Sequence, residues 1–183
     1  MNIYHLVPDV NRYQSLIVGS GKRLNEVSKF TFGNPVLEIW EPVQVRLATD
    51  LDKPPLPISD FPGLGGMPAF TGKAIESLDE MLRMNGELLP LESDDGVFYL
   101  YNTTTIVDAL DEEKSDLLRN KNGQIRHIRK HHFIPQKVIE LMIFKTVQAP
   151  RTSYPCVTDR FVNAVEQAQL TGFVFRKLWS SDE

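Results

Sequence analysis

The chain has 183 residues, 42% of them hydrophobic and 24% charged, with 12 Pro, 11 Gly and a formal net charge of -4. This composition is typical of a folded globular protein and excludes a disordered, collagen-like or coiled-coil chain. A chain of this length buries roughly 70% of the surface that its unfolded form exposes, which is enough for one sizeable core. The acidic net charge argues against nucleic acid as the main partner, because phosphate binding needs a basic surface.

The compartment is indicated by one cysteine and by the apolar pattern. Cys156 is the single cysteine, so it cannot form an internal disulfide, which agrees with a reducing environment. The first residues lack a basic, apolar leader, and no segment approaches the roughly 18 apolar residues of a membrane helix. We therefore expect a cytoplasmic protein with no membrane partner.

The first third of the chain is expected to be extended. Apolar runs at residues 3–7 and 13–18 end at turn-forming Pro or Gly, and apolar residues alternate over residues 39–47. A period of two is typical of a strand, and Pro42 inside this stretch indicates an edge or a bulge. Residues 53–68 hold five Pro and three Gly, so we predict a shaped loop there.

The clearest helix signal follows this loop. Thr71 stands at an N-cap position ahead of Ile75, Leu78 and Leu82, which share one helical face, and Asn85-Gly86 marks the end. Residues 88–92 and 97–101, joined by Ser93-Asp94-Asp95-Gly96, are predicted to form a hairpin.

The second half alternates the same kinds of signal. Asn102 or Thr105 is predicted to cap a short helix through residues 106–110, and Asn122-Gly123 predicts a hairpin turn. Pro135 suits the first turn of a helix that carries Val138, Leu141 and Met142.

A last capped helix is predicted after Thr158, and Gly172 then precedes an extended run. This order repeats that of Thr71 and Gly86. A helix-and-strand unit used twice and a coincidence both account for the match.

Charge is distributed unevenly along the chain. Residues 73–116 hold twelve acids and three bases, a net charge of -9, whereas residues 119–151 hold eight bases and one acid, a net charge of +7. Such segments either face each other or solvent in the fold, or present an acidic docking face to a basic partner.

No motif nominates a catalytic residue, a cofactor site or a metal ligand. The glycine-rich stretches at residues 19–22 and 63–66 lack the spacing of a phosphate loop or a dinucleotide fingerprint. His127 and His131 are expected on a strand, where four positions separate them by about 13 Å, too far for one zinc ion.

Cys156 is interpreted as a buried structural thiol, because no activating base can be located beside it. The aromatic residues Trp40, Trp179, Phe173 and Phe175 are interpreted as core residues rather than as a ligand platform.

Four segments in a fixed order carry a resemblance to a known family. They are Ser59-Asp60-Phe61-Pro62 with residues 66–70, then residues 85–91, residues 106–115 and residues 157–173. Together they resemble immunity protein family eleven of the bacterial polymorphic toxin systems, over about residues 57–179. The order and spacing of the four segments make a chance similarity improbable.

The resemblance implies an antidote, a small cytoplasmic protein that is encoded beside a toxin, binds it and blocks its activity. It implies no catalytic residue, cofactor or metal. Many intracellular toxins are nucleases with basic active sites, which an acidic patch can cover. The toxin-binding candidates are therefore the acidic residues of two turns, namely Asp94 and Asp95 or Asp111, Glu112 and Glu113.

We predict one α+β domain over residues 1–183, with antiparallel β-hairpins and three or four helices. Two closely packed lobes are the alternative, a strand-rich lobe 1–52 and an α+β lobe 69–183 joined by a connector at 53–68. Whether the chain is a monomer or a homodimer stays open.

Two other functions are weighed against toxin neutralisation. A general protein-interaction module would show an exposed apolar patch and self-association. A small hydrolase or transferase would show a pocket that holds a carboxylate and a histidine of shifted pKa.

Overall fold

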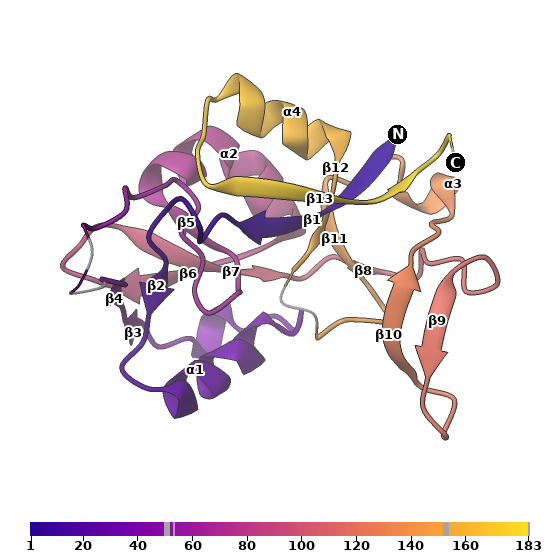
Figure 1. Cartoon of the computed structure of the whole chain (residues 1–183), viewed down its shortest axis with the longest axis horizontal. Coiled ribbons are helices and arrows are strands. Elements are labelled where there is room, and N and C mark those ends of the chain that lie inside the picture. Colours follow the sequence, from indigo (N-terminus) through magenta and orange to yellow (C-terminus); the bar gives the residue numbers. More distant parts are fainter. Residues whose placement is uncertain (50–51, 53, 152–153, 183) are drawn as a thin grey trace.

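The computed structural model describes residues 1–49, 52, 54–151 and 154–182. Four α-helices and mostly antiparallel strands within these residues confirm the predicted α+β class (Figure 1). Residues 50 and 51 of the predicted lobe 1–52, residue 53 of the connector and residue 183 lie outside the described residues. The division into lobes stays a prediction.

The helices and strands of the described residues follow in chain order. The strands are β1 (Asn2–Pro8), β2 (Leu16–Ile17), β3 (Val43–Gln44), β4 (Arg46–Leu47), β5 (Ala69–Thr71), β6 (Gly86–Glu92), β7 (Phe98–Thr103), β8 (Ile106–Val107), β9 (Asp116–Arg119), β10 (Ile125–Lys130), β11 (Ile143–Thr146), β12 (Cys156–Thr158) and β13 (Phe173–Ser180). The α-helices are α1 (Gly21–Ser28), α2 (Gly72–Asn85), α3 (Pro135–Val138) and α4 (Asp159–Gln167), and the 3₁₀ helices are η1 (Lys29–Thr31) and η2 (Leu37–Ile39).

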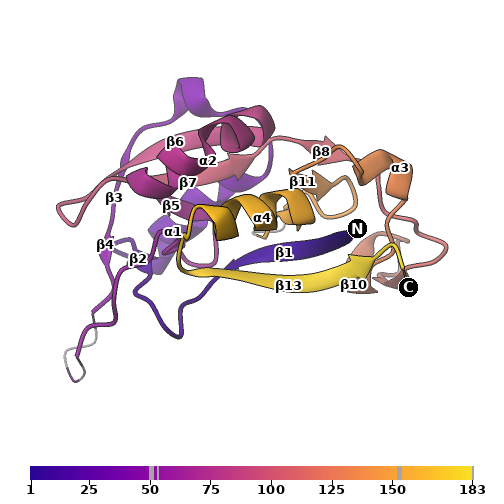
Figure 2. The same cartoon turned by 90° about the horizontal axis from the view of Figure 1, so that it is seen from above.

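Two larger sheets organise the chain. One has the strand order β13-β1-β12-β11-β8, and the other has the order β3-β6-β7-β5 (Figure 2). Two-stranded ladders of β9 with β10 and of β2 with β4 complete the pairing. The first strand of the chain is therefore hydrogen-bonded between strands from its last thirty residues.

The two larger sheets contain the same three-stranded arrangement. In one sheet β7 lies between β5 and β6, antiparallel to both, and α2 connects these outer strands. In the other sheet β1 lies between β12 and β13, again antiparallel to both, and α4 connects them. The helix-and-strand unit that the sequence matched twice is therefore present twice in the topology.

The two units differ in whether their two paired strands are joined by a turn. In the first unit β6 runs directly into its partner β7, whereas in the second unit the paired strands β13 and β1 are the last and the first of the chain. The N-terminal ammonium of Met1 donates a hydrogen bond to Ser181 Oγ at 2.8 Å, and Ser181 N donates to Met1 O at 2.9 Å. The chain ends thus lie side by side where the first unit has a turn (Figure 1).

One hydrophobic core joins the two units, because α2 and α4 lie on the same side of the sheets (Figure 2). Phe61 lies at its centre, with ring centroids 4.8 Å from Phe70 and 4.7 Å from Phe173. Phe175 packs at its edge, and Trp40 and Trp179 are buried in two further clusters. The four aromatic residues interpreted as core residues are confirmed as such.

Several local predictions are confirmed. The Thr71 hydroxyl accepts a hydrogen bond from Ala74 N at 3.3 Å and caps α2. The predicted hairpins correspond to β6–β7 and β9–β10, and Gly123 in the second turn has a φ of +79°, where a glycine is favoured. Residues 54–68 contain no helix or named strand, as expected for a shaped loop.

The helix predicted through residues 106–110 is wrong. Residues 106 and 107 form β8, which pairs in parallel with β11, so that Ile106 lies opposite Lys145. Asn102, the predicted cap, is buried in β7, where it accepts from Gly33 N at 3.1 Å and donates to Asn34 O at 2.8 Å. Its partners are distant in sequence, so a local capping pattern could not reveal them.

The N-terminal third is less extended than predicted. The expected strand over residues 39–47 is replaced by η2 and the short strands β3 and β4, and Ile39 is 70% exposed. Trp40 turns inward instead, and its indole N–H donates to Pro90 O at 2.8 Å. Ser20, interpreted as part of a turn, caps the unpredicted helix α1 by accepting from Arg23 N.

Candidate functional site

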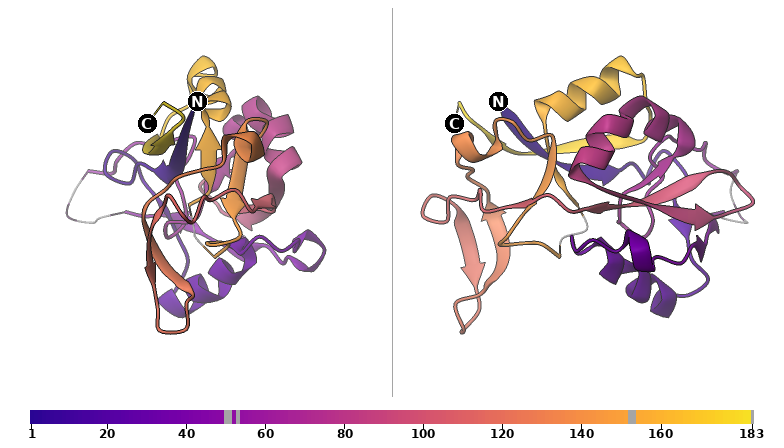
Figure 3. Two further views of the ribbon diagram at one scale, coloured as in Figure 1. Left: turned by 90° about the vertical axis from the view of Figure 1, so that its right-hand side faces the viewer. Right: turned by 180° about the vertical axis from the view of Figure 1, so that it is seen from behind.

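The β9–β10 hairpin extends away from the two larger sheets (Figure 3). Leu117 and Ile128 hold it in place by packing against the cluster that contains Phe133 and Trp179. Next to its turn the Arg119 guanidinium donates to Glu112 Oε2 at 2.5 Å. The hairpin is therefore anchored on one side while most of its other side chains are exposed.

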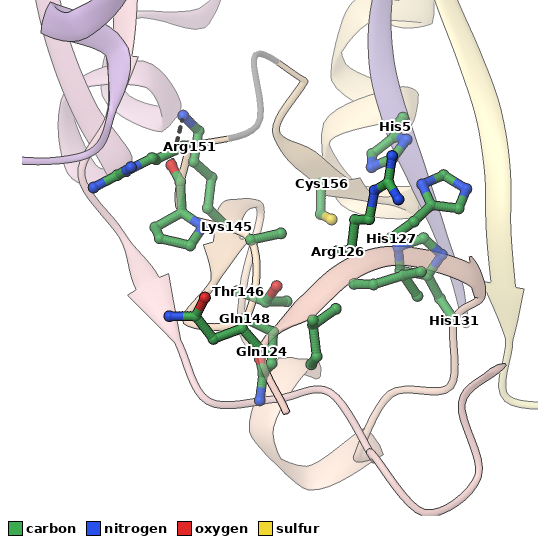
Figure 4. Close-up of a pocket in the computed structure, with 14 residues that line it drawn as sticks. His5, Gln124, Arg126, His127, His131, Lys145, Thr146, Gln148, Arg151 and Cys156 are labelled. Atoms are coloured by element: carbon green, nitrogen blue, oxygen red, sulfur yellow. Dashed lines mark hydrogen bonds between the residues drawn. The ribbon is translucent and has the colours of Figure 1, made fainter. Parts of the chain in front are cut away.

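A cavity of about 670 Å³ lies beside this hairpin. Figure 4 shows His5, Arg126, His127 and His131 on one side of it and Lys145, Thr146, Gln148 and Arg151 on the other, with Cys156 between the two groups. None of the lining residues is an Asp or a Glu. The size is within the range of small-molecule sites.

Two of the pocket histidines are uncharged at neutral pH. The rings of His5 and His131 meet edge to face, with centroids 5.6 Å apart. Burial, with contributions from His131 and Arg176, lowers the pKa of His5 to about 4. Burial lowers the pKa of His131 to about 4 as well, with His127 contributing. These rings offer hydrogen bonds rather than charge.

Lys145 is buried, and its side chain forms hydrogen bonds within the fold. Its ammonium group donates to Thr31 O at 2.5 Å and to Pro150 O at 3.4 Å, the second of which is dashed in Figure 4. Burial lowers the pKa of Lys145 to about 8. Because both bonds go to main-chain carbonyls, this side chain holds η1 and the loop at residue 150 against β11.

Cys156 behaves as the sequence predicts. It is 5% exposed, and burial raises the pKa of its thiol to about 12. A thiol with so high a pKa is almost entirely protonated at neutral pH, and the thiolate is the nucleophilic form. The interpretation of Cys156 as a buried structural thiol is confirmed.

The described residues that line the cavity do not include the carboxylate that a hydrolase or transferase was expected to hold beside a histidine. The pocket holds histidines of shifted pKa, but no carboxylate lines it beside them. Within the described ranges, no group of three or more His, Cys, Asp or Glu side chains is placed to hold a metal ion. His127 lies in β10, as predicted for a strand residue.

The first acidic pair, Asp94 and Asp95, lies exposed in the turn between β6 and β7. The carboxylate of Asp95 accepts a hydrogen bond from Leu47 N at 2.8 Å, which ties the turn to β4. Asp94 has no hydrogen bond or ion pair among the residues that the structure describes. Of this pair, only Asp94 can contact a partner without first losing a hydrogen bond within the chain.

The second acidic group lies between β8 and β9. Asp111 accepts from the main-chain N–H groups of Glu113 and Lys114, each at 3.2 Å. Hydrogen bonds from Arg119 and Gln148 hold the pKa of Glu112 below its ordinary value. The carboxylate of Glu113 is exposed and makes no bond within the described part of the chain, so it is the free acid of this group.

The structure does not bring the two acidic groups together. Figures 1 and 2 place the β6–β7 turn and the segment between β8 and β9 at opposite ends of the long axis. A single compact patch that contains all five carboxylates is therefore excluded.

The acidic segment 73–116 and the basic segment 119–151 are connected by ion pairs at some of their charged residues only. Ion pairs Arg119–Glu112 at 2.5 Å and Lys137–Asp108 at 3.4 Å connect them. Four exposed cations of the hairpin have no ion pair with a carboxylate in the described ranges: Lys121, Arg126, Arg129 and Lys130. Sequence reasoning identified the basic segment but missed the pocket beside the hairpin, because His5 and Cys156, which are distant in sequence, also line it.

Comparison with known families gives one match. The model described as Immunity protein family (Imm11) matches residues 90–179, from within β6 to within β13, which confirms the resemblance to this family over these residues. The matched region includes the hairpin and all five acidic candidates. No curated protein matches the chain. No helix within the described residues is long and apolar enough to cross a membrane.

Proposed function

We propose that this chain, which matches the immunity protein family Imm11 over residues 90–179, binds a cognate bacterial toxin in the cytoplasm and neutralises it. The family match is the observation that carries the proposal. An inhibitor of this kind needs a stable core and a complementary surface, but no nucleophile or cofactor. The inward-facing bonds of Lys145 and the protonated thiol of Cys156 agree with such a role.

The toxin contact is proposed at the hairpin end of the molecule. There the segment with Glu113 joins the projecting hairpin through the Glu112–Arg119 pair, so acidic and basic side chains are presented together. Interfaces of mixed charge steer the encounter and fix its orientation. The Asp94–Asp95 turn at the opposite end is the alternative contact.

Two matched variants separate these surfaces. Glu113→Lys and Asp94→Lys each reverse one exposed carboxylate that makes no bond within the described residues, so neither should disturb the fold. We expect Glu113→Lys to weaken toxin binding at least about tenfold and Asp94→Lys to leave it unchanged. The reverse result would move the interface to the β6–β7 turn. If both variants bind the toxin as tightly as wild type, the proposal of an acidic contact is wrong.

The function itself is tested by co-expression with the product of an adjacent gene. Rescue of growth together with co-purification is the expected result. If the neighbour is harmless alone and nothing co-purifies, a general protein-interaction module becomes the better reading. Self-association in analytical ultracentrifugation would then support that hypothesis.

A further inference from the structure

Both irregular positions of β10 are arginines. In the β9–β10 ladder Ile125 pairs with Arg119 and His127 with Leu118, so Arg126 has no opposite residue. Ile128 and Lys130 pair with successive residues of β9 in the same way and leave Arg129 without one. Such bulges re-aim a side chain, and they are frequent beside functional sites.

The hairpin carries a positive charge that the molecule does not neutralise. Lys121, Arg126, Arg129 and Lys130 are exposed without a carboxylate partner in the described part of the chain, and Asp116 is the one acidic residue of the hairpin. Unpaired like charges on a small projecting element repel one another. The folded chain gains nothing from this arrangement, whereas a negatively charged partner would.

The pocket distinguishes between kinds of negative partner. Gln148 Nε2 donates to Asp108 Oδ1 and to Glu112 Oε1, each at 3.0 Å, which fixes the orientation of the amide. The remaining atom, Gln148 Oε1, is buried and has no hydrogen-bond partner. This oxygen is buried, so an N–H or O–H donor from a molecule in the pocket reaches it only after the side chains that cover it shift.

A peptide supplies both groups that the site lacks. Its side-chain carboxylate can pair with the fork of Arg126, and its main-chain N–H can donate to Gln148 Oε1. A phosphate group at neutral pH offers mainly acceptors, so it would satisfy the arginine and leave the glutamine oxygen unpaired. The observations therefore favour an acidic peptide segment over an inorganic or nucleic-acid phosphate.

We propose that the bulged Arg126 and Arg129, with the pocket beside them, bind an acidic peptide segment of the protein partner. This inference rests on the proposed function, in which that partner is the toxin. Arg126 binds a carboxylate at the pocket, Arg129 binds a second one outside it, and Gln148 fixes the peptide main chain.

The test compares toxin affinity of the full chain for three double variants by isothermal titration calorimetry. Arg126→Glu with Arg129→Glu should weaken binding about 100-fold, since two buried interface arginines are typical hot spots. Arg126→Lys with Arg129→Lys should recover part of this loss, because charge returns without the bidentate fork. The control, Arg46→Glu with Arg83→Glu, makes the same charge change elsewhere and should stay within about threefold of wild type. Circular dichroism of each variant checks that it folds.

The outcomes separate the two proposals. Toxin binding that is unaffected by the arginine reversal would overturn the hairpin site and leave toxin neutralisation standing. If wild type binds no toxin, NMR titration with acetylated hexaglutamate, inorganic phosphate and a single-stranded RNA decides the inference alone. Shifts of the hairpin resonances with hexaglutamate, lost in the reversed variant, would support it. Stronger binding of phosphate or RNA, or no binding of the peptide, would overturn it.

Discussion

The carboxylate of Asp60 accepts two hydrogen bonds from Thr171, one from its main-chain N–H at 2.8 Å and one from its hydroxyl at 2.9 Å. Lys73 adds an ion pair at 3.2 Å, and Asp60 is only 8% exposed. Asp60 lies in the Pro/Gly-rich loop, whereas Thr171 precedes β13. This one side chain therefore connects the loop to the start of α2 and to the last strand.

Asp60→Ala should lower the free energy of unfolding by about 1–3 kcal/mol, because it removes two hydrogen bonds to a charged carboxylate that is itself buried. Urea denaturation followed by tryptophan fluorescence measures this. Asp79→Ala, which removes an exposed ion pair with Arg83, should cost less than about 1 kcal/mol. Equal effects of the two substitutions would contradict the structural role of Asp60.

Gly172 and Gly123 form a matched pair for a steric test. Both have a positive φ, +86° and +79°, but a Cβ at Gly172 would collide with the Ser59 side chain, whereas space around Gly123 is open. Gly123→Ala should cost about 1 kcal/mol from backbone strain alone. Gly172→Ala should cost roughly 1–3 kcal/mol more from the added clash. Similar losses of stability would show that Ser59 and Gly172 are not in close contact.

Stability should decrease as the pH falls from 6.5 to 4. The pKa values of His5 and His131 are lowered to about 4 in the folded chain, so the unfolded chain binds more protons over this interval. Their contribution is complete above pH 6.5 and disappears as the pH approaches 4. Because the rings keep some solvent contact, we expect a combined loss of order 2 kcal/mol.

The pH effect is measured as the difference between wild type and a His5→Gln, His131→Gln variant. Carboxylates titrate near the lower limit in both chains, so only the difference reports the two histidines. Parallel stability curves from pH 7 to pH 4 would contradict the lowered pKa values.

Native Cys156 should resist thiol reagents. Its thiol is buried and its pKa is raised to about 12, so little thiolate is present at pH 8. Labelling with 5,5′-dithiobis(2-nitrobenzoate) should be at least about a hundredfold slower than in 6 M urea. Rapid stoichiometric labelling of the folded chain would show that the pocket exposes the sulfur.

Local sequence signals predicted the elements whose determinants are neighbours along the chain. The Thr71 cap, the face formed by Ile75, Leu78 and Leu82, and the Asn122-Gly123 turn each depend on residues a few positions apart. Asn102 had an equally good capping pattern, yet its bonds to Gly33 and Asn34 bring it into a strand. A local capping pattern does not predict the structure where hydrogen bonds to residues distant in sequence satisfy the same side chain.

The candidate site was less accessible to sequence reasoning than the fold. The basic segment was visible as a net charge, but the pocket requires β1, β10 and β11 to meet. The pairing of β12 with both β1 and β11 brings these two strands together, and the packing of Leu117 and Ile128 places β10 beside them. The position of Arg126 at a bulge follows from strand register, which composition does not encode. The predicted acids divided for the same reason, because two turns of similar composition lie at opposite ends of the molecule (Figure 1).

The most direct measurement is the affinity of the purified chain for the purified product of the adjacent toxin gene, together with the residual activity of that toxin. We predict a complex with a dissociation constant in the nanomolar range or below and loss of toxin activity as the complex forms. Absence of binding at micromolar concentrations, with the toxin fully active, would contradict the account.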